Sequence, residues 1–483
     1  MAIRSFAPIL AALVASIAAA VASDTATAQS ARSVDARAAA VIDHWTPERR
    51  AAAIPRDLVI DSRGLGFMRQ PGNTLVPYGH TVAALASSQD KPNAAPGGSG
   101  DTTGPSISTM NPGAGTTVGA TTTFSATVTD PSGVKSVSIR VQKSGGAAQT
   151  FAASKGSGDS WSTTVSGLTD GAWNWSIVAK DGAKLGGGNT TTSATLAFTV
   201  SVSGGGGGSG EVPNAEWTQD GVVQNAAGRI YFEMPDSRRR TRWSGYVCSG
   251  TVVTDSTIGR SIILTASHCI YDDANKAFAR HVLFIPDQAD TTGSGTDISC
   301  SNDRFGCWVP NFGAVDVNWT TRTFPDNVHW DYAFYVVPDS GAHQAGYTTT
   351  TSEALDMAVG PMEMMFSAPA LSLTHALGYS YDVDPQFMYC ADALQSLDAD
   401  DWWLGNCGLS GGSSGGPWVQ PMNATTGNGP VMSVNSWGYT NQAGMAGPKL
   451  LGTSASCVFA SAKSSSFGAF ADGEAGVKVS CTQ

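Results

Sequence analysis

The eight cysteines are the feature that most constrains the fold of this 483-residue chain. Their number is even, and none forms the paired Cys-x-x-Cys knuckles that a structural zinc site would need. The pattern therefore predicts a disulfide framework in an oxidising compartment. All of the cysteines lie in the C-terminal half, as Cys248, Cys269, Cys300, Cys307, Cys390, Cys407, Cys457 and Cys481.

The number of cysteines leaves their pairing open, because eight cysteines can be joined in many ways. Closeness in the sequence favours a Cys300–Cys307 disulfide. Cys390–Cys407 together with Cys457–Cys481 is the simplest completion, and Cys407–Cys457 is the alternative.

The N-terminus has the pattern of a secretory signal peptide. Arg4 supplies the positive start, Phe6 to Ala22 is apolar, and Ala26-Thr27-Ala28 is a small-x-small cleavage site. We therefore predict a signal peptide over residues 1–28 and a secreted protein, extracellular or periplasmic. A membrane anchor is the alternative, but the run is short and alanine-rich, and no other segment could span a bilayer.

Composition narrows the classes of partner and fold. The net charge of −11 argues against binding to nucleic acid or an anionic membrane through bulk charge. Only 14% of the residues are charged, and runs rich in Thr, Val and aromatic residues favour strands over helices. We therefore expect an all-β protein with more than one domain.

Residues 29–100 are interpreted as a pro-region and linker. Thr46 can cap a short helix that opens with Pro47 and Glu48. The region ends in "SSQDKPNAAPGGSG", whose composition is that of a linker.

Residues 101–202 read as several short alternating strands separated by turn signals, which is typical of a β-sandwich. "TDPSGVKSVSIRV" and "GAWNWSIVAKDG" resemble the immunoglobulin-like modules of bacterial exported proteins. This unit has no cysteine pair, so it must depend on an apolar core, expected from Trp161, Trp173 or Trp175, Val137, Ile139 and Ile177. It would bind a surface or polymer ligand, or act as a spacer. A glycine-rich linker, residues 203–214, follows.

Residues 215–483 carry all the cysteines and are again strand-patterned and rich in turns. "GRIYF" and "SGYVC" read as two strands, so "SRRRTR" at 237–242 is expected at the exposed tip of a hairpin. A processing site is the alternative interpretation of those arginines.

One glycine-rich stretch in this unit holds a candidate nucleophile. Gly412-Ser413-Ser414-Gly415-Gly416 fits Gly-x-Ser-x-Gly, the pattern of α/β-hydrolases, in which the histidine follows the serine. No histidine follows Ser414, so the α/β-hydrolase order is excluded. A base must come from upstream.

Two upstream residues are candidates for the remaining catalytic roles. His268 follows the apolar run "RSIILTAS", and Asp331 precedes the apolar run "YAFYVV". A buried carboxylate needs a partner that offsets its desolvation, and an imidazole would serve. Taken singly, His268 could be structural and Asp331 could be a turn residue.

The order His268, Asp331, Ser414 is that of the chymotrypsin triad. Five motifs, in order, resemble the trypsin/chymotrypsin family: "CSGTVV", "LTASHC", "WDYAF", "GGSSGGPW" and "NSWGY". The resemblance implies a chymotrypsin-like double β-barrel over residues 215–483. It also implies that Ser414 is the nucleophile, His268 the base and Asp331 the residue that orients the base.

Further roles are carried over from the same resemblance. The N–H groups of Gly412 and Ser414 would form the oxyanion hole, and Ser436 would bond Asp331. Ser436, Trp437 and Gly438 would pair with the substrate backbone. A Cys248–Cys269 disulfide is also implied.

The chain departs from the family at several positions. Ser413 stands where the family has an aspartate that pairs with a freshly cut N-terminus, and no Ile-Val-Gly-Gly sequence is present. Gly408 replaces the aspartate that gives trypsin its preference for basic residues. Asn435 replaces the histidine of glutamate-specific relatives, so the specificity stays open.

The sequence therefore predicts a secreted, monomeric serine endopeptidase that acts on proteins or peptides and needs no metal or other cofactor. A catalytically inactive protease fold that only binds is one alternative. An esterase without peptidase activity is the other.

Overall fold

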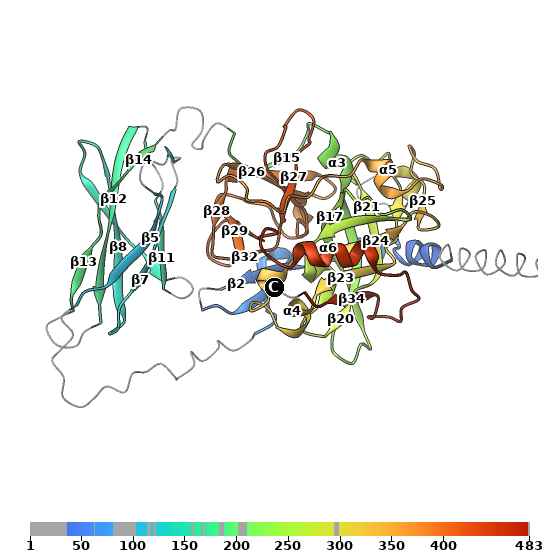
Figure 1. Cartoon of the computed structure of the whole chain (residues 1–483), viewed down its shortest axis with the longest axis horizontal. Helices are drawn as coiled ribbons and strands as arrows, with labels where there is room; N and C mark the ends of the chain where they lie inside the picture. The colour runs from blue at the N-terminus through green and yellow to red at the C-terminus, as the bar shows by residue number, and fades with distance from the viewer. Residues whose placement is uncertain are drawn as a thin grey trace, which may run out of the picture.

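The computed structural model describes residues 36–61, 63–80, 103–113, 117–118, 122–155, 159–165, 168–169, 171–182, 188–200, 210–293 and 299–481. Strands dominate these residues, and the longest of the helices with given bounds, α6 (Ala455–Ser464), has 10 residues. The chain is all-β, as its composition predicts (Figure 1). None of the described helices is long and apolar enough to cross a membrane. The predicted signal peptide and its cleavage site lie outside the described residues.

The unit between residues 103 and 200 consists of two sheets with a shared core (Figure 1). Its core contains all the residues expected from the sequence, including both Trp173 and Trp175. One sheet has the order β10 (Ser154–Lys155), β11 (Ser160–Val165), β7 (Thr122–Thr129), β5 (Ser106–Asn111). The other has the order β6 (Thr117–Val118), β14 (Leu196–Val200), β12 (Gly171–Asp181), β8 (Val134–Lys143), β9 (Ala148–Ala152), with β13 (Thr190–Thr192) on β12.

A ten-stranded sheet forms one part of the C-terminal unit. The strands β16 and β17 form a hairpin with residues 237–242 in its turn, which confirms the expected hairpin. The sheet has the order β25 (His343–Gln344), β22 (Cys307–Trp308), β21 (Arg280–Pro286), β16 (Ala227–Pro235), β17 (Trp243–Val253), β18 (Arg260–Thr265), β24 (Ala333–Pro338), β23 (Phe312–Asp316), β34 (Gly476–Val479). A short strand from far upstream, β1 (Ile54–Pro55), pairs with β17.

Three more sheets complete this unit, and a single apolar cluster connects them with the first. The five-stranded sheet has the order β15 (Val212–Glu216), β27 (Phe387–Ala393), β26 (Leu373–Tyr379), β30 (Pro417–Val419), β31 (Val431–Val434). The seven-stranded sheet has the order β28 (Gln395–Ser396), β29 (Asp401–Leu404), β33 (Met445–Pro448), β32 (Trp437–Tyr439), β2 (Asp57–Ile60), β3 (Gly66–Gln70), β4 (Thr74–Pro77). A two-stranded sheet joins β19 (Tyr271–Asp272) to β20 (Ala277–Phe278).

Residues 36–80, which we call the N-terminal block, pack into the C-terminal unit. Residues 36–44 are helical, and α2 (Pro47–Ala52) begins after Thr46, whose side chain accepts a hydrogen bond from the Arg49 N–H, as the sequence predicts. The strands β1 and β2 then join sheets of the C-terminal unit, so the block shares its core instead of forming one of its own.

Four disulfides connect the eight cysteines. They are Cys248–Cys269, Cys300–Cys307, Cys390–Cys407 and Cys457–Cys481, with S–S distances of 2.01, 2.13, 1.98 and 2.04 Å. The simplest completion is therefore present, and the alternative pairing of Cys407 with Cys457 is not.

Candidate active site

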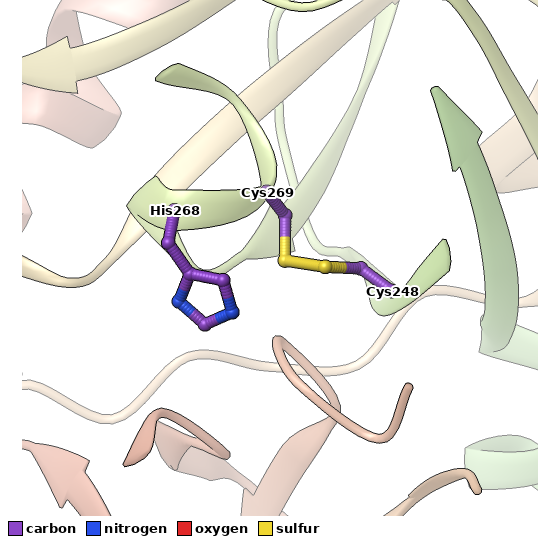
Figure 2. A group of neighbouring side chains, drawn as sticks. All are labelled: Cys248, His268 and Cys269. Carbon is purple, nitrogen blue, oxygen red and sulfur yellow. A yellow bond between two sulfur atoms is a disulfide. The ribbon is translucent and has the colours of Figure 1, made fainter. Parts of the chain in front are cut away.

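His268 and Asp331 lie beside each other because the strands that lead to them are paired. β18 runs into the 3-10 turn Ser267–Cys269, while β24 begins just after Asp331, and Thr265 pairs with Ala333 in the ladder. The Cys248–Cys269 disulfide ties this turn to β17, beside the His268 ring (Figure 2). The histidine is therefore fixed from both sides.

The carboxylate of Asp331 holds His268 at two points. The His268 backbone N–H donates to Asp331 Oδ1 at 2.8 Å, and Nδ1 lies 2.7 Å from Oδ2. Both side chains are buried, with relative exposures of 0% and 1%. The Ser436 hydroxyl donates to Oδ2 at 2.5 Å, as the resemblance implies. Three donors around the carboxylate offset part of the free energy that its burial costs.

The other ring nitrogen of His268 is left available. With Nδ1–H donating to the carboxylate, Nε2 carries the lone pair and can accept a proton. This nitrogen is buried and has no hydrogen-bond partner among the described residues. A fixed tautomer with a free basic nitrogen is what a general base requires.

Ser414 lies in the turn between β29 and β30 and contacts Cys269, the residue after His268. Its carbonyl accepts a hydrogen bond from the Ser249 N–H at 2.7 Å and lies 3.8 Å from Cys269 Sγ. Gly415 follows with φ +80°, and a Cβ there would lie 2.1 Å from Thr265 Oγ1. Only glycine permits this close packing against the end of β18. No hydrogen bond joins Ser414 Oγ to His268 Nε2 among the described residues, and such contacts are often long before substrate binds.

The backbone carbonyls that precede Gly412 and Ser414 in the turn are both held by hydrogen bonds. The Gly411 carbonyl accepts from the Tyr381 N–H at 2.8 Å, and the Ser413 carbonyl accepts from Gly416 N–H at 2.9 Å and Asn435 Nδ2 at 3.0 Å. In a trans peptide the N–H points away from the C=O of the same unit. The N–H groups of Gly412 and Ser414 are therefore turned away from these anchors.

Arg229 is a functional candidate that sequence reasoning missed. It is buried in β16, and its Nη1 donates to the carbonyls of Tyr379 at 2.7 Å and Gly412 at 3.5 Å, while its Nη2 pairs with Asp384. The Ser249 hydroxyl also donates to the Gly412 carbonyl, at 2.9 Å. The sequence signal that could have revealed Arg229 is an arginine inside the apolar run "GRIYF". A charge that is buried with such a run needs a partner.

Ser413, at the position where trypsin-like proteases have an aspartate, has a local role. Its hydroxyl donates to the Ser410 carbonyl at 2.8 Å, within the same turn. The Arg229–Asp384 ion pair, buried on its arginine side, lies against the turn that carries Ser414.

Two further positions bear on specificity. The Asn435 side chain is buried and bonded to the Leu377 carbonyl, the Ser413 carbonyl and Trp418 Nε1, so it supports the turn and is not free to bind a substrate. A side chain on Gly408 would face the backbone of Pro213 at 3.4 Å. Neither position offers a charged group to a substrate.

Three clusters of His, Cys and acidic side chains within the described residues have ligand atoms close together. In one of them, Cys248 and Cys269 form a disulfide, so their sulfurs are not thiolate ligands. In another, His44 Nδ1 lies 2.6 Å from an Arg49 nitrogen, and Arg280 donates to Glu233 at 2.7 Å. The third joins His329 to Asp401, whose hydrogen bond raises the pKa of His329. We assign no metal to them.

The comparisons with known proteins give no family. No family model matches the chain, and no curated protein matches it. Dimeric latent PorU from Porphyromonas gingivalis matches 31% of this chain with 14% identity and a TM-score of 0.18, and the match spans only 16% of PorU. The fibronectin(III)-like modules of CbhA from Clostridium thermocellum have 14% identity and a TM-score of 0.16, covering 38% of this chain and 86% of theirs.

A tetra-tandem repeat from the extending region of a large adhesion protein covers 72% of this chain and 73% of its own, with 14% identity and a TM-score of 0.17. These scores are too low to support an argument about function, which must therefore come from the site itself.

Proposed function

We propose that this chain is a serine endopeptidase of the chymotrypsin class. Ser414 Oγ attacks the carbonyl carbon of a peptide bond while His268 Nε2 takes the hydroxyl proton. Asp331 stabilises the imidazolium that forms, and the N–H groups of Gly412 and Ser414 bind the oxyanion, where one donor typically contributes roughly 3 kcal/mol.

The second half of the reaction reverses these roles. His268 gives its proton to the leaving amine, and the acyl group stays on Ser414. A water molecule then loses a proton to His268 Nε2 and attacks the acyl carbon, and the acid product leaves as Ser414 regains its proton. No metal or organic cofactor takes part in these steps.

The distribution of the residues supports the chymotrypsin-like double barrel as part of this proposal. His268 and Asp331 come from the ends of β18 and β24 in the ten-stranded sheet. Ser414 and Ser436 precede β30 and β32, in the two other sheets. A triad assembled where two β units meet is the arrangement that the resemblance implies.

The single observation that carries the proposal is the pair formed by His268 Nδ1 and Asp331 Oδ2 at 2.7 Å, with Nε2 left unbonded. The test is labelling of the processed protein with a fluorophosphonate probe, with the labelled peptide mapped by mass spectrometry. We expect the label on Ser414 and its loss in Ser414→Ala and His268→Ala. Ser410→Ala, a serine in the same turn, is the matched control and should keep the label.

The outcome also decides between the alternatives. Absence of label on folded, processed protein would overturn the protease and favour an inactive fold that only binds. Label on Ser414 together with turnover of esters but not of any peptide library would favour the esterase. Peptide hydrolysis that depends on Ser414 supports the proposal.

The remaining parts of the chain fit an exported enzyme. We propose secretion after cleavage within residues 1–28, proteins or peptides as substrates, and action as a monomer. The four disulfides suit an oxidising compartment. The sandwich is proposed as an immunoglobulin-like module that binds a surface or polymer, or spaces the protease from its point of attachment.

A further inference from the structure

A strand of the N-terminal block lies on the edge where a substrate would pair. β2 runs parallel to β32, with Leu58 opposite Trp437, Val59 opposite Gly438 and Ile60 opposite Tyr439. The Thr440 N–H donates to the Ile60 carbonyl at 3.0 Å, just past the end of β32. The backbone edge that we assign to substrate binding is therefore already occupied by the chain itself.

The residues just before β2 cover the turn that holds the nucleophile. A Cβ on Gly411 would lie 2.6 Å from Asp57 Cβ and 2.8 Å from Pro55 Cβ, so these side chains lie directly on the peptide before Gly412. On the far side, Ile54 and Pro55 pair with Tyr246 and Val247 of β17. Residues 54–60 thus cross the site from the ten-stranded to the seven-stranded sheet.

Two buried side chains anchor this segment in addition to the pairing of β2. Trp45 is buried, and its Nε1 donates to the His281 carbonyl at 2.6 Å. Arg56 is buried between the rings of Tyr78 and Tyr246, with its Nη1 3.6 Å from Asp272. Contacts of this kind contribute several kcal/mol when they are removed from a core, so the segment is not held by β2 alone.

We propose that residues 54–60 are an intramolecular inhibitor, a strand that occupies the substrate edge of β32 and shields Ser414. This rests on the proposed function. A cut anywhere beyond residue 80 would leave the block bound through Trp45 and Arg56. Exposure of the site therefore requires the block to undock, and cleavage of the chain behind it is not sufficient.

The positions of its carbonyl groups explain why residues 54–60 would not be hydrolysed by the site that they cover. Hydrolysis needs a peptide carbonyl placed between Ser414 Oγ and the N–H groups of Gly412 and Ser414. Among the described residues, no carbonyl of 54–60 accepts a bond from either N–H, and the Ile60 carbonyl is engaged with Thr440. The segment therefore covers the catalytic groups without presenting a bond to them.

The test compares variants of the full chain by two readouts. One is the rate at which the fluorophosphonate probe labels Ser414, and the other is hydrogen exchange of the Trp437–Thr440 amides, which does not depend on activity. Trp45→Ala opens a cavity where the block packs against Tyr231 and His281, and we expect labelling to rise at least tenfold and these amides to exchange faster. Val76→Ala, on the exposed strand β4 of the same block, is the matched control and should change neither.

Each combination of results has a separate meaning. Faster exchange with unchanged, measurable labelling overturns the inhibitory role, and so does a variant that changes neither readout. Faster exchange with no label on any variant overturns the proposed protease while showing that the segment covers β32. If Trp45→Ala does not fold, with its disulfides and melting transition as the criterion, Leu58→Ala weakens the contact at β32 itself and is measured in its place.

Discussion

The sandwich and the C-terminal unit are both β-rich, but they bury different kinds of side chain. In the described part of the sandwich, Asp181 is the only charged or polar residue that is buried, and the core is apolar. The C-terminal unit buries many polar groups, among them Arg229, His268 and Asp331. Burying such groups costs free energy unless each is paired. The proposed function gives three of these groups a catalytic or supporting role, whereas the described sandwich residues bury almost nothing that could take one.

One buried aspartate from each unit makes the sharpest version of this comparison. Asp331 accepts from His268 and Ser436, whereas Asp181 accepts from the Asn189 backbone at 2.8 Å and its side chain at 2.7 Å, closing a loop of the sandwich. We expect Asp331→Asn to lower kcat about 10⁴-fold, because the amide favours the wrong histidine tautomer. Asp181→Asn should leave kcat unchanged. Steady-state kinetics on a peptide substrate measure both.

Stability serves as the control for this pair. The melting temperature of Asp331→Asn should lie within a few degrees of that of the parent protein, so its loss of activity cannot come from unfolding. If Asp181→Asn lowered kcat as strongly, or Asp331→Asn left it intact, the division of roles between the two units would be wrong.

Removal of one disulfide is the next largest expected effect. Cys248→Ala combined with Cys269→Ala should lower the stability of the C-terminal unit by about 2–5 kcal/mol and also free the turn that carries His268. The sandwich has no cysteine, so its transition should not move. Calorimetry that resolves two transitions is the measurement. If the two transition temperatures shifted by the same amount, the two units would unfold together and could not be compared as separate units.

Asp57 makes docking of the inhibitory segment depend on pH. Burial raises the pKa of Asp57 to about 6 from 3.8, with Arg69 and His268 opposing the rise and Asp382 adding to it. Its side chain keeps 17% exposure beside a cavity of about 250 Å³. A raised pKa means that the docked state binds more protons than the undocked state. Docking is therefore strongest below pH 3.8, where Asp57 is protonated in both states. It weakens as the pH rises from 3.8 to about 6 and stays constant above that pH.

The equilibrium constant for undocking of residues 54–60 should therefore rise by up to about 100-fold as the pH increases from 3.8 to above 6. The difference between those two pKa values sets this limit. The probe labelling rate of the parent divided by that of Asp57→Asn at each pH isolates this group, because the activity profile of His268 cancels. We expect the ratio to increase with pH over that window. A ratio that stays flat would show that Asp57 is not desolvated in the docked segment.

The sequence was sufficient for the elements whose signal is local. The cap at Thr46, the hairpin around 237–242 and the apolar core of the sandwich follow from residue types and spacing. The bond from Ser436 to Asp331 also matched its prediction, though that came from resemblance. Local sequence patterns do not reveal contacts between segments that are far apart in the chain. The pairing of β2 with β32 joins residues almost 400 positions apart, and Arg229 reaches a carbonyl 183 positions away.

The smallest predicted effect tests whether the two cores are energetically separate. Ile177 in the sandwich and Ile263 in the C-terminal unit are both fully buried in strands. Replacing either by valine deletes one methyl group, which typically costs about 1 kcal/mol. Ile177→Val should lower only the sandwich transition and leave activity unchanged, while Ile263→Val should lower only the other. The double variant should show the sum of the two effects, because sites without shared partners are additive. Any coupling beyond about 0.5 kcal/mol would show that the sandwich stabilises the catalytic unit and is more than a spacer.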